Sequence, residues 1–160
     1  MQGNKKMKSE KPVIVVSNRK AEFEYFLTER YEAGLVLSGT EIKSIRNHEA
    51  GLNEAYCMFM NGELFVRGMH IAHYKEGTYN NHDEKRDRKL LLNKNEIKKL
   101  LLKVKDKGTT IIPVKLYFNE RSFIKLEIAI ARGKKKVDKR NSIKEKDQKR
   151  EAKRSLKGMD

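Results

Sequence analysis

Alternation of apolar and polar residues dominates the second half of the chain. From Phe123 to Arg132 apolar side chains occupy every second position, the period of two typical of a half-buried strand. Thr109 to Asn119 shows the same alternation, and the residues between the two stretches suffice for a short turn. We therefore predict an antiparallel hairpin here, with Pro113 marking a bulge or a sheet edge.

A second hairpin is predicted earlier in the chain. The stretches Ala55 to Met60 and Glu63 to Ile71 flank Asn61-Gly62, a dipeptide that favours a type I′ turn. Shorter stretches predict further strands over 13–17, 23–30 and 35–37, whereas 72–92 fits neither the strand period nor the helix period.

Two stretches have helical spacing. Residues 38–46 place Ile42 and Ile45 three apart behind a Ser or Thr cap, which predicts a short amphipathic helix. Residues 93–107 carry a longer apolar stripe, entered from Asn93 or Asn95 and followed by Gly108 at a C-cap position. Many short antiparallel strands with two or three short packing helices predict a mainly β fold. Among such folds an OB-type closed antiparallel barrel is a common nucleic-acid platform.

The charge is large and unevenly distributed. The chain has 160 residues, with 37 Lys and Arg against 22 Asp and Glu, a net charge of +15. Residues 133–160 contribute +7 (12 against 5) and residues 1–11 contribute +3 (4 against 1), which leaves +5 for the rest. We therefore expect a basic N-terminal extension (1–11), an OB-fold RNA-binding domain (12–132) and a basic C-terminal tail (133–160). Nucleic acid is the favoured polyanionic partner.

Several classes of protein are not favoured by the sequence. No run approaches the roughly 18 apolar residues of a membrane span, so we expect no membrane partner. Met1 to Lys11 lacks the apolar region of a secretory signal, which predicts a cytoplasmic protein. Cys57 is the single cysteine, so an internal disulfide or a thiolate-rich zinc site is excluded, and we expect Cys57 to be buried on a strand.

The tail has the spacing of a basic helix. Its cations recur at steps of three and four residues from about Ser142 onward, with Asp147 and Glu151 on another face. Such a helix has no broad apolar stripe to bury. We expect the tail to be disordered alone and to become helical when phosphates line its basic side. A solvated charge run that improves solubility is the alternative.

Four motifs in succession give the chain a family resemblance. They are Asn18-Arg19-Lys20-Ala21, the run from Glu32 to Arg46 (EAGLVLSGTEIKSIR), Arg88-Lys89-Leu90-Leu91-Leu92, and Gly133-Lys134-Lys135 with Asp138-Lys139-Arg140. In order and spacing they resemble the motifs of the small protein B family.

The resemblance implies an OB-fold barrel without enzymatic activity, cofactor or metal. Its partners would be transfer-messenger RNA, the ribosome at its decoding centre and small-subunit RNA, and elongation factor Tu through the shared RNA. It implies a monomer that carries the tRNA-like part of transfer-messenger RNA into stalled ribosomes for trans-translation.

The predicted RNA-binding residues combine cations, one amide, one carboxylate and one apolar side chain. Cations suit RNA phosphates, and a carboxylate can accept hydrogen bonds from base amino groups. The resemblance maps contacts with the RNA elbow onto Glu32 and Leu91. A charged turn at residues 18–20, a surface acid at 32 and core leucines at 90–92 are the structural alternatives. The predicted set is Asn18, Arg19, Lys20, Glu32, Arg88, Lys89 and Leu91.

The tail supplies a second predicted set, which by resemblance senses an empty mRNA path. Val137 departs from the family pattern, because the family often has a His or an aromatic residue there. Such a ring can stack on a decoding-centre base, whereas Val can pack against one but cannot stack. The set is Gly133, Lys134, Lys135, Val137, Asp138, Lys139, Arg140, Lys149, Arg150, Lys153 and Arg154.

Two other functions are open to this sequence. His70, His73 and His82 raise the possibility of a metal site or a nuclease. However, residues three apart on a strand point to opposite faces, and no acidic cluster is in evident register. A structural ribosomal protein or an OB-fold initiation-type factor would share the basic body and the tail.

Overall fold

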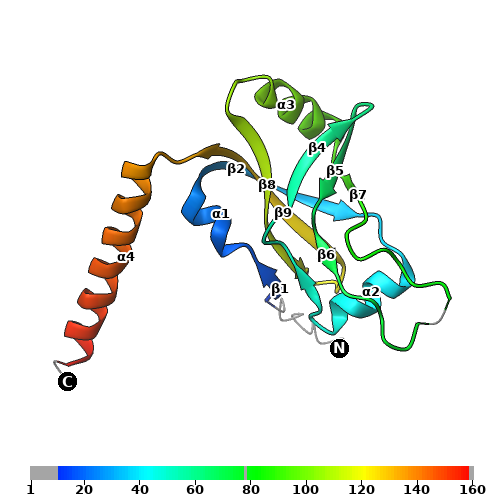
Figure 1. Ribbon diagram of the computed structural model, residues 1–160, viewed down its shortest axis with the longest axis horizontal. Helices are drawn as coiled ribbons and strands as arrows, with labels where there is room; N and C mark the ends of the chain where they lie inside the picture. Colours follow the sequence, from blue (N-terminus) through cyan, green and yellow to red (C-terminus); the bar gives the residue numbers. More distant parts are fainter. Residues whose placement is uncertain (1–10, 78, 159–160) are drawn as a thin grey trace, which may run out of the picture.

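The computed structural model describes residues 11–77 and 79–158 and shows a mainly β protein (Figure 1). The N-terminal extension predicted over 1–11 therefore lies almost wholly outside the described residues. The seven-stranded sheet consists of β1 (Val13–Ser17), β2 (Tyr25–Leu35), β4 (Tyr56–Met60), β5 (Glu63–Arg67), β7 (Arg88–Leu91), β8 (Thr109–Phe118) and β9 (Ile124–Gly133). A separate two-stranded sheet pairs β3 (Ala50–Gly51) with β6 (His70–Ile71).

The strands of the large sheet pair in a ring. Antiparallel pairing runs in the order β8-β4-β5-β7-β2-β9, and β9 pairs again with β8. The strand β8 also pairs with β1, which takes the half of the β8 edge that β4 does not use. A register shift between Pro113 and Lys115 separates these halves, so the predicted bulge at Pro113 is confirmed. The mainly β prediction is also confirmed, while the OB type of barrel stays a prediction.

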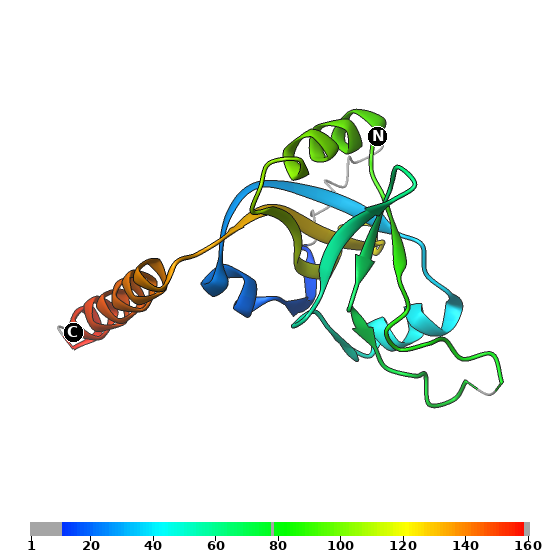
Figure 2. The same ribbon diagram turned by 45° about the horizontal axis from the view of Figure 1, so that its top comes forward.

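Four helices accompany the sheet in the described part of the chain. They are α1 (Arg19–Glu24), α2 (Gly39–Arg46), α3 (Lys94–Val104) and α4 (Lys136–Lys157). The helices α3 and α2 lie at opposite ends of the strands, and α4 extends away from the sheet in both views (Figure 1, Figure 2). Leu100 of α3 and Ile45 of α2 are fully buried, which explains why these two amphipathic stretches fold onto the sheet.

Both predicted hairpins are present. The β4–β5 hairpin turns at Asn61 (φ 52) and Gly62 (φ 77), the two positive φ values that a type I′ turn requires. The β8–β9 hairpin has the predicted alternation, because Leu126, Ile128 and Ile130 point into the core. Cys57 is buried on β4 as expected, and burial raises the pKa of its thiol.

Several elements differ from the sequence prediction. The strand predicted over 63–71 is divided into β5 and β6, and the strands predicted over 23–30 and 35–37 form the single strand β2, which ends at Leu35. Residues 19–24 form α1, where a strand was expected from residue 23. Residues 88–91 form β7, within a stretch that had no recognisable period. Helix α4 begins at Lys136, before the expected start near Ser142, because Asp138 accepts a hydrogen bond from Lys135 N at 3.3 Å and caps an earlier first turn.

Candidate nucleic-acid interface

The outward-pointing residues of β2 and its neighbouring strands form one continuous surface. Opposed residues in a sheet share a face, so Leu91, Gly34 and Lys125 form a row across β7, β2 and β9. Two positions along β2, Glu32 lies opposite Glu127 in the next row. We call this surface the outer face; it consists of Arg30, Glu32 and Gly34 of β2, Leu91 of β7, Lys115 and Tyr117 of β8, and Lys125 and Glu127 of β9.

Glu32 is exposed on the outer face and is held in place by Tyr117. The hydroxyl of Tyr117 donates a hydrogen bond to Oε2 of Glu32. Burial and this carboxylate raise the pKa of Tyr117, so the phenol stays protonated and remains a donor at neutral pH. A carboxylate has about four acceptor sites, so Glu32 retains capacity for donors such as base amino groups.

Leu91 is the apolar member of the outer face, with 50% of its surface exposed. Its neighbour Leu90 is buried in the core, so the alternation of β7 separates a core leucine from a surface leucine. Gly34 lies beside Leu91, and a Cβ there would come within 3.3 Å of Leu91 Cβ. Lys89, a half-buried residue of the same motif, pairs with Glu63 at 2.9 Å.

The motif Asn18-Arg19-Lys20 is divided between structure and surface. Asn18 is 3% exposed, accepts a hydrogen bond from Ala21 N at 3.2 Å and donates one to Pro113 O at 3.0 Å. The amide of Asn18 therefore has a structural role, since it caps α1 and ties it to β8, while an RNA contact at Asn18 stays a prediction. Arg19 is exposed and lines a hollow of about 270 Å³ with Arg30 and Lys115, beside the outer face. Lys20 is also exposed, within reach of Glu24.

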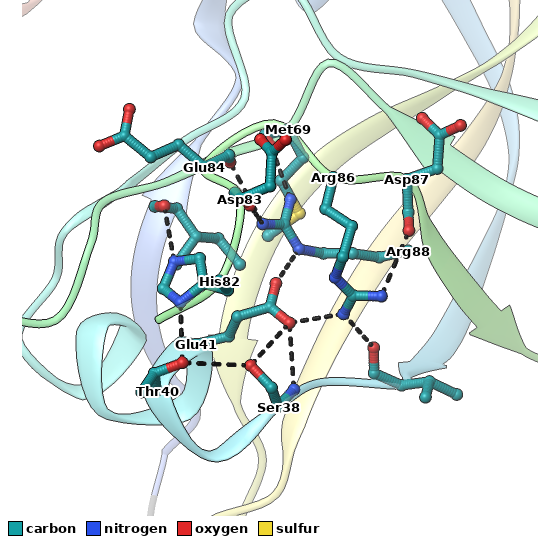
Figure 3. A network of polar contacts seen from close by, with 12 residues as sticks. Ser38, Thr40, Glu41, Met69, His82, Asp83, Glu84, Arg86, Asp87 and Arg88 are labelled. Atoms are coloured by element: carbon teal, nitrogen blue, oxygen red, sulfur yellow. Dashed lines mark hydrogen bonds and ion pairs between the residues drawn. The ribbon is translucent and has the colours of Figure 1, made fainter. Parts of the chain in front are cut away.

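Arg88 also has a structural place, in a buried network shown in Figure 3. Its side chain is 0% exposed, it pairs with Glu41 of α2, and it donates to Met69 O at 2.6 Å. Arg86 reaches the other oxygen of the same carboxylate. In this structure the Arg88 guanidinium is enclosed by protein groups, so its role here is structural, and an RNA contact at Arg88 stays a prediction.

Glu41 is the centre of this network. Burial alone would raise its pKa, but hydrogen bonds donated by Arg86, by Ser38 N and by Arg88 outweigh burial and lower the pKa to about 2. His82 extends the network, with its ring nitrogens 2.9 Å from Thr40 Oγ1 and 2.9 Å from Ile71 O. The network joins α2 to the start of β7 and thereby positions the strand that carries Lys89 and Leu91.

The tail joins the body at Lys134. The ammonium group of Lys134 donates to Glu22 O at 3.2 Å and to Ser142 Oγ at 2.8 Å, and lies 5.2 Å from the ring centroid of Phe26. The backbone N of Lys134 donates to Glu24 O at 2.8 Å. Lys134 thus connects α1, β2 and α4, and we call this set of contacts the Lys134 joint.

The remaining tail residues lie on an exposed helix or just before it. Within the described helix α4 no side chain is buried, and Val137 is 66% exposed. Gly133 ends β9 and Lys135 caps α4, so both flank the Lys134 joint. Asp138 and Ser142 form hydrogen bonds within the first turns of α4. Lys139 is half-buried, and the remaining predicted cations are exposed: Arg140, Lys149, Arg150, Lys153 and Arg154.

Comparison with known proteins gives the family. The family model described as SmpB protein matches residues 15–158. The chain belongs to the SmpB family. It is 52% identical over 146 residues to the SsrA-binding protein of Bacteroides thetaiotaomicron, covering 91% of this chain and 97% of that protein. It is 54% identical over 141 residues to the SsrA-binding protein of Cytophaga hutchinsonii, covering 88% and 92%.

A solved structure supports the same assignment. One chain of the structure described as "tmRNA-SmpB: a journey to the center of the bacterial ribosome" is 45% identical and has a TM-score of 0.64. The match covers 76% of this chain and 85% of that chain. The resemblance of the four motifs to the SmpB family is therefore confirmed.

The structure also bears on the metal site that the histidines of the sequence suggested. His70 Nε2 lies 3.2 Å and His73 Nδ1 lies 3.7 Å from the carboxylate of Glu84. Among residues 11–77 and 79–158, no group of three or more His, Cys, Asp or Glu side chains could hold a metal ion. In the same part of the chain, no helix has the length and apolar character needed to cross a membrane.

Sequence reasoning missed Arg46, Arg121, Phe123 and Lys125, which line a groove together with the predicted residue Leu91. This groove has a volume of about 410 Å³. These residues come from β7, the β8–β9 hairpin and α2, so only the fold brings them together. The one available signal was Phe123, an aromatic residue directly after the predicted turn.

Proposed function

We propose that this protein binds the tRNA-like part of transfer-messenger RNA through the outer face and delivers it to stalled ribosomes for trans-translation. The observation that carries the proposal is that the outer face brings Glu32 and Leu91 together and has Arg19 at its border. Membership of the SmpB family supports it, as do relatives named for binding SsrA. No catalytic step is part of the proposal.

The outer face offers three kinds of contact that RNA recognition uses. Arg19, Arg30 and Lys115 can contact phosphates, which position the RNA. The carboxylate of Glu32, aimed by Tyr117, can accept from base amino groups. Leu91 offers apolar contact to an unstacked base.

The tail has a separate part in the proposed function. Helix α4 carries ten Lys and Arg against four Asp and Glu and stands away from the sheet, so its phosphate contacts need not compete with those of the outer face (Figure 2). We assign it to the mRNA path and decoding centre of the ribosome. The proposed activity would take place in the cytoplasm, on a monomer, with elongation factor Tu meeting the protein through the shared RNA.

The test is a gel-shift with the tRNA-like fragment of a bacterial transfer-messenger RNA. Glu32→Ala removes a negative charge, so simple electrostatics predicts tighter binding, whereas loss of a specific acceptor predicts weaker binding. We expect Glu32→Ala and Leu91→Asp each to weaken binding about tenfold or more, the scale of one lost specific contact. Asp106→Ala, which makes the same charge change in the turn after α3, should not weaken it.

A truncation separates the two parts of the proposed function. Ending the chain after Arg132 should leave most RNA affinity in place and abolish peptide tagging in a reconstituted translation system. Loss of all RNA binding on truncation would move RNA capture to the tail. Capture of ribosomal subunits without transfer-messenger RNA from a lysate would favour a ribosomal protein or an initiation-type factor instead.

A further inference from the structure

The groove beside Leu91 combines exposed apolar side chains with cations. Phe123 is 60% exposed and Leu91 is 50% exposed, and both line the same hollow of about 410 Å³. Single exposed apolar residues are common on protein surfaces, but exposed apolar residues that gather at a hollow indicate an interaction site. Arg46, Arg121 and Lys125 line the same hollow, and none of its described lining residues is acidic. An anionic ligand with a flat apolar part fits this composition.

The backbone of the β8–β9 hairpin fixes the position of Phe123. Asn119 Oδ1 accepts hydrogen bonds from Arg121 N at 3.0 Å and from Phe123 N at 2.9 Å. Asn119 N donates to Phe123 O at 2.9 Å, and Ser122 adopts a positive φ of 63°. This Asx-type turn holds the backbone at Phe123, so a ligand that stacks on its exposed ring loses little entropy by ordering the loop.

Gly34 keeps the groove open. It lies between Leu91 and Lys125 in one row of the sheet, and any side chain there would point outward between them. Its missing side chain leaves an apolar wall on one side and a cation on the other. Arg121 also lines the adjoining hollow that contains Glu32 and Tyr117, so RNA leaving the groove would meet the rest of the outer face.

We propose that this groove holds one unpaired nucleotide of the bound RNA, with its base stacked on Phe123 against Leu91 and its phosphates contacted by Arg46 and Arg121. The inference rests on the proposed function, because it names the chemical group of transfer-messenger RNA that the outer face receives. Stacking on an aromatic ring recognises an unstacked base of any identity, while cations around the ring hold the backbone.

The test measures affinity, salt dependence and base stacking on the same complexes. Phe123→Ala should weaken binding of the tRNA-like fragment about tenfold, the size of one stacked base, and Phe123→Trp should restore it. Leu102→Ala, which removes an exposed apolar side chain from α3, should leave affinity unchanged. Arg121→Ala should lower the slope of log affinity against log salt by about 0.7 to 0.9, whereas Phe123→Ala should not change that slope.

Base stacking is read from RNAs that carry 2-aminopurine at each unpaired position in turn. One position should be quenched by the wild-type protein and the Phe123→Trp variant but not by Phe123→Ala. If the wild-type protein binds the fragment and Phe123→Ala binds it with the same affinity and the same 2-aminopurine quenching, this inference is wrong and the proposed function stands. Failure of the wild-type protein to bind the fragment would overturn the proposed function as well.

Discussion

At the scale of single residues, the structure separates charges that are open to solvent from buried charges that hold the fold. Arg88 and Lys89 are adjacent in one motif, yet Arg88 is enclosed with Glu41 while Lys89 points outward. The sequence could not distinguish them, because the burial of Arg88 depends on Glu41, a residue on a distant helix. Asn18 and Arg19 divide in the same way. Period-two alternation identified Leu126 and Ile128 as core residues, but no such pattern marks a buried cation.

The Glu41 network makes a prediction about stability and pH. The pKa of Glu41 is lowered from 4.5 to about 2 in the folded protein, so its ionised form stabilises the fold above about pH 4.5. This stabilisation, about 3 kcal/mol, should be lost as pH falls from about 4.5 to about 2. Glu41→Gln should therefore lower the free energy of unfolding at pH 7 by about 3 kcal/mol, and its difference from wild type should shrink across that window.

Urea unfolding curves at a series of pH values test this prediction. Glu63→Gln, which removes a half-exposed partner of Lys89, is the matched control and should cost at most about 1 kcal/mol. A Glu41→Gln variant as stable as wild type at pH 7 would show that Arg86 and Arg88 do not depend on the carboxylate.

At the scale of elements, the sequence predicted those whose local signals agree with their tertiary setting. The two hairpins were predictable because Asn61-Gly62 and the alternation after Phe123 each specify both strands and turn. Helix α1 was missed because it has six residues and depends on the bond from Asn18 to Pro113. The outer face was not predictable as a surface, since pairing of β2 with both β7 and β9 creates it.

Helix α4 carries a prediction of its own. Pro at Lys149, in the interior of the helix, costs roughly 3 kcal/mol and would lower the population of the continuous helix by roughly a hundredfold. Lys149→Pro should therefore sharply reduce tagging on stalled ribosomes, with affinity for the tRNA-like fragment near wild type. Lys149→Arg keeps the charge and the helix and should tag normally. Normal tagging by the Pro variant, in the same reconstituted assay, would make the tail a charged tether.

At the scale of the whole molecule, charge and architecture divide along the same line. The body, residues 12–132, carries +5 and contains the ring of strands, whereas residues 133–160 carry +7. In the proposed function, the body binds transfer-messenger RNA first, and the basic tail then contacts the ribosome to which that RNA is delivered. The division into these parts stays a prediction that truncation tests.

The Lys134 joint has a mechanical consequence. A helix of 22 residues is about 33 Å long, so a rotation of roughly 10° at its base moves its far end by roughly 6 Å. The contacts of the Lys134 ammonium group restrain the angle between α4 and the sheet. Because α4 is long, a small increase in the range of this angle produces a large spread in the position of its C-terminal end. Lys134→Ala should broaden the distance distribution between spin labels at positions 98 and 153, whereas Lys135→Ala, with the same charge change, should not. Distance distributions of equal width in the two variants would mean that the Lys134 joint does not orient α4 and that a binding partner sets its direction.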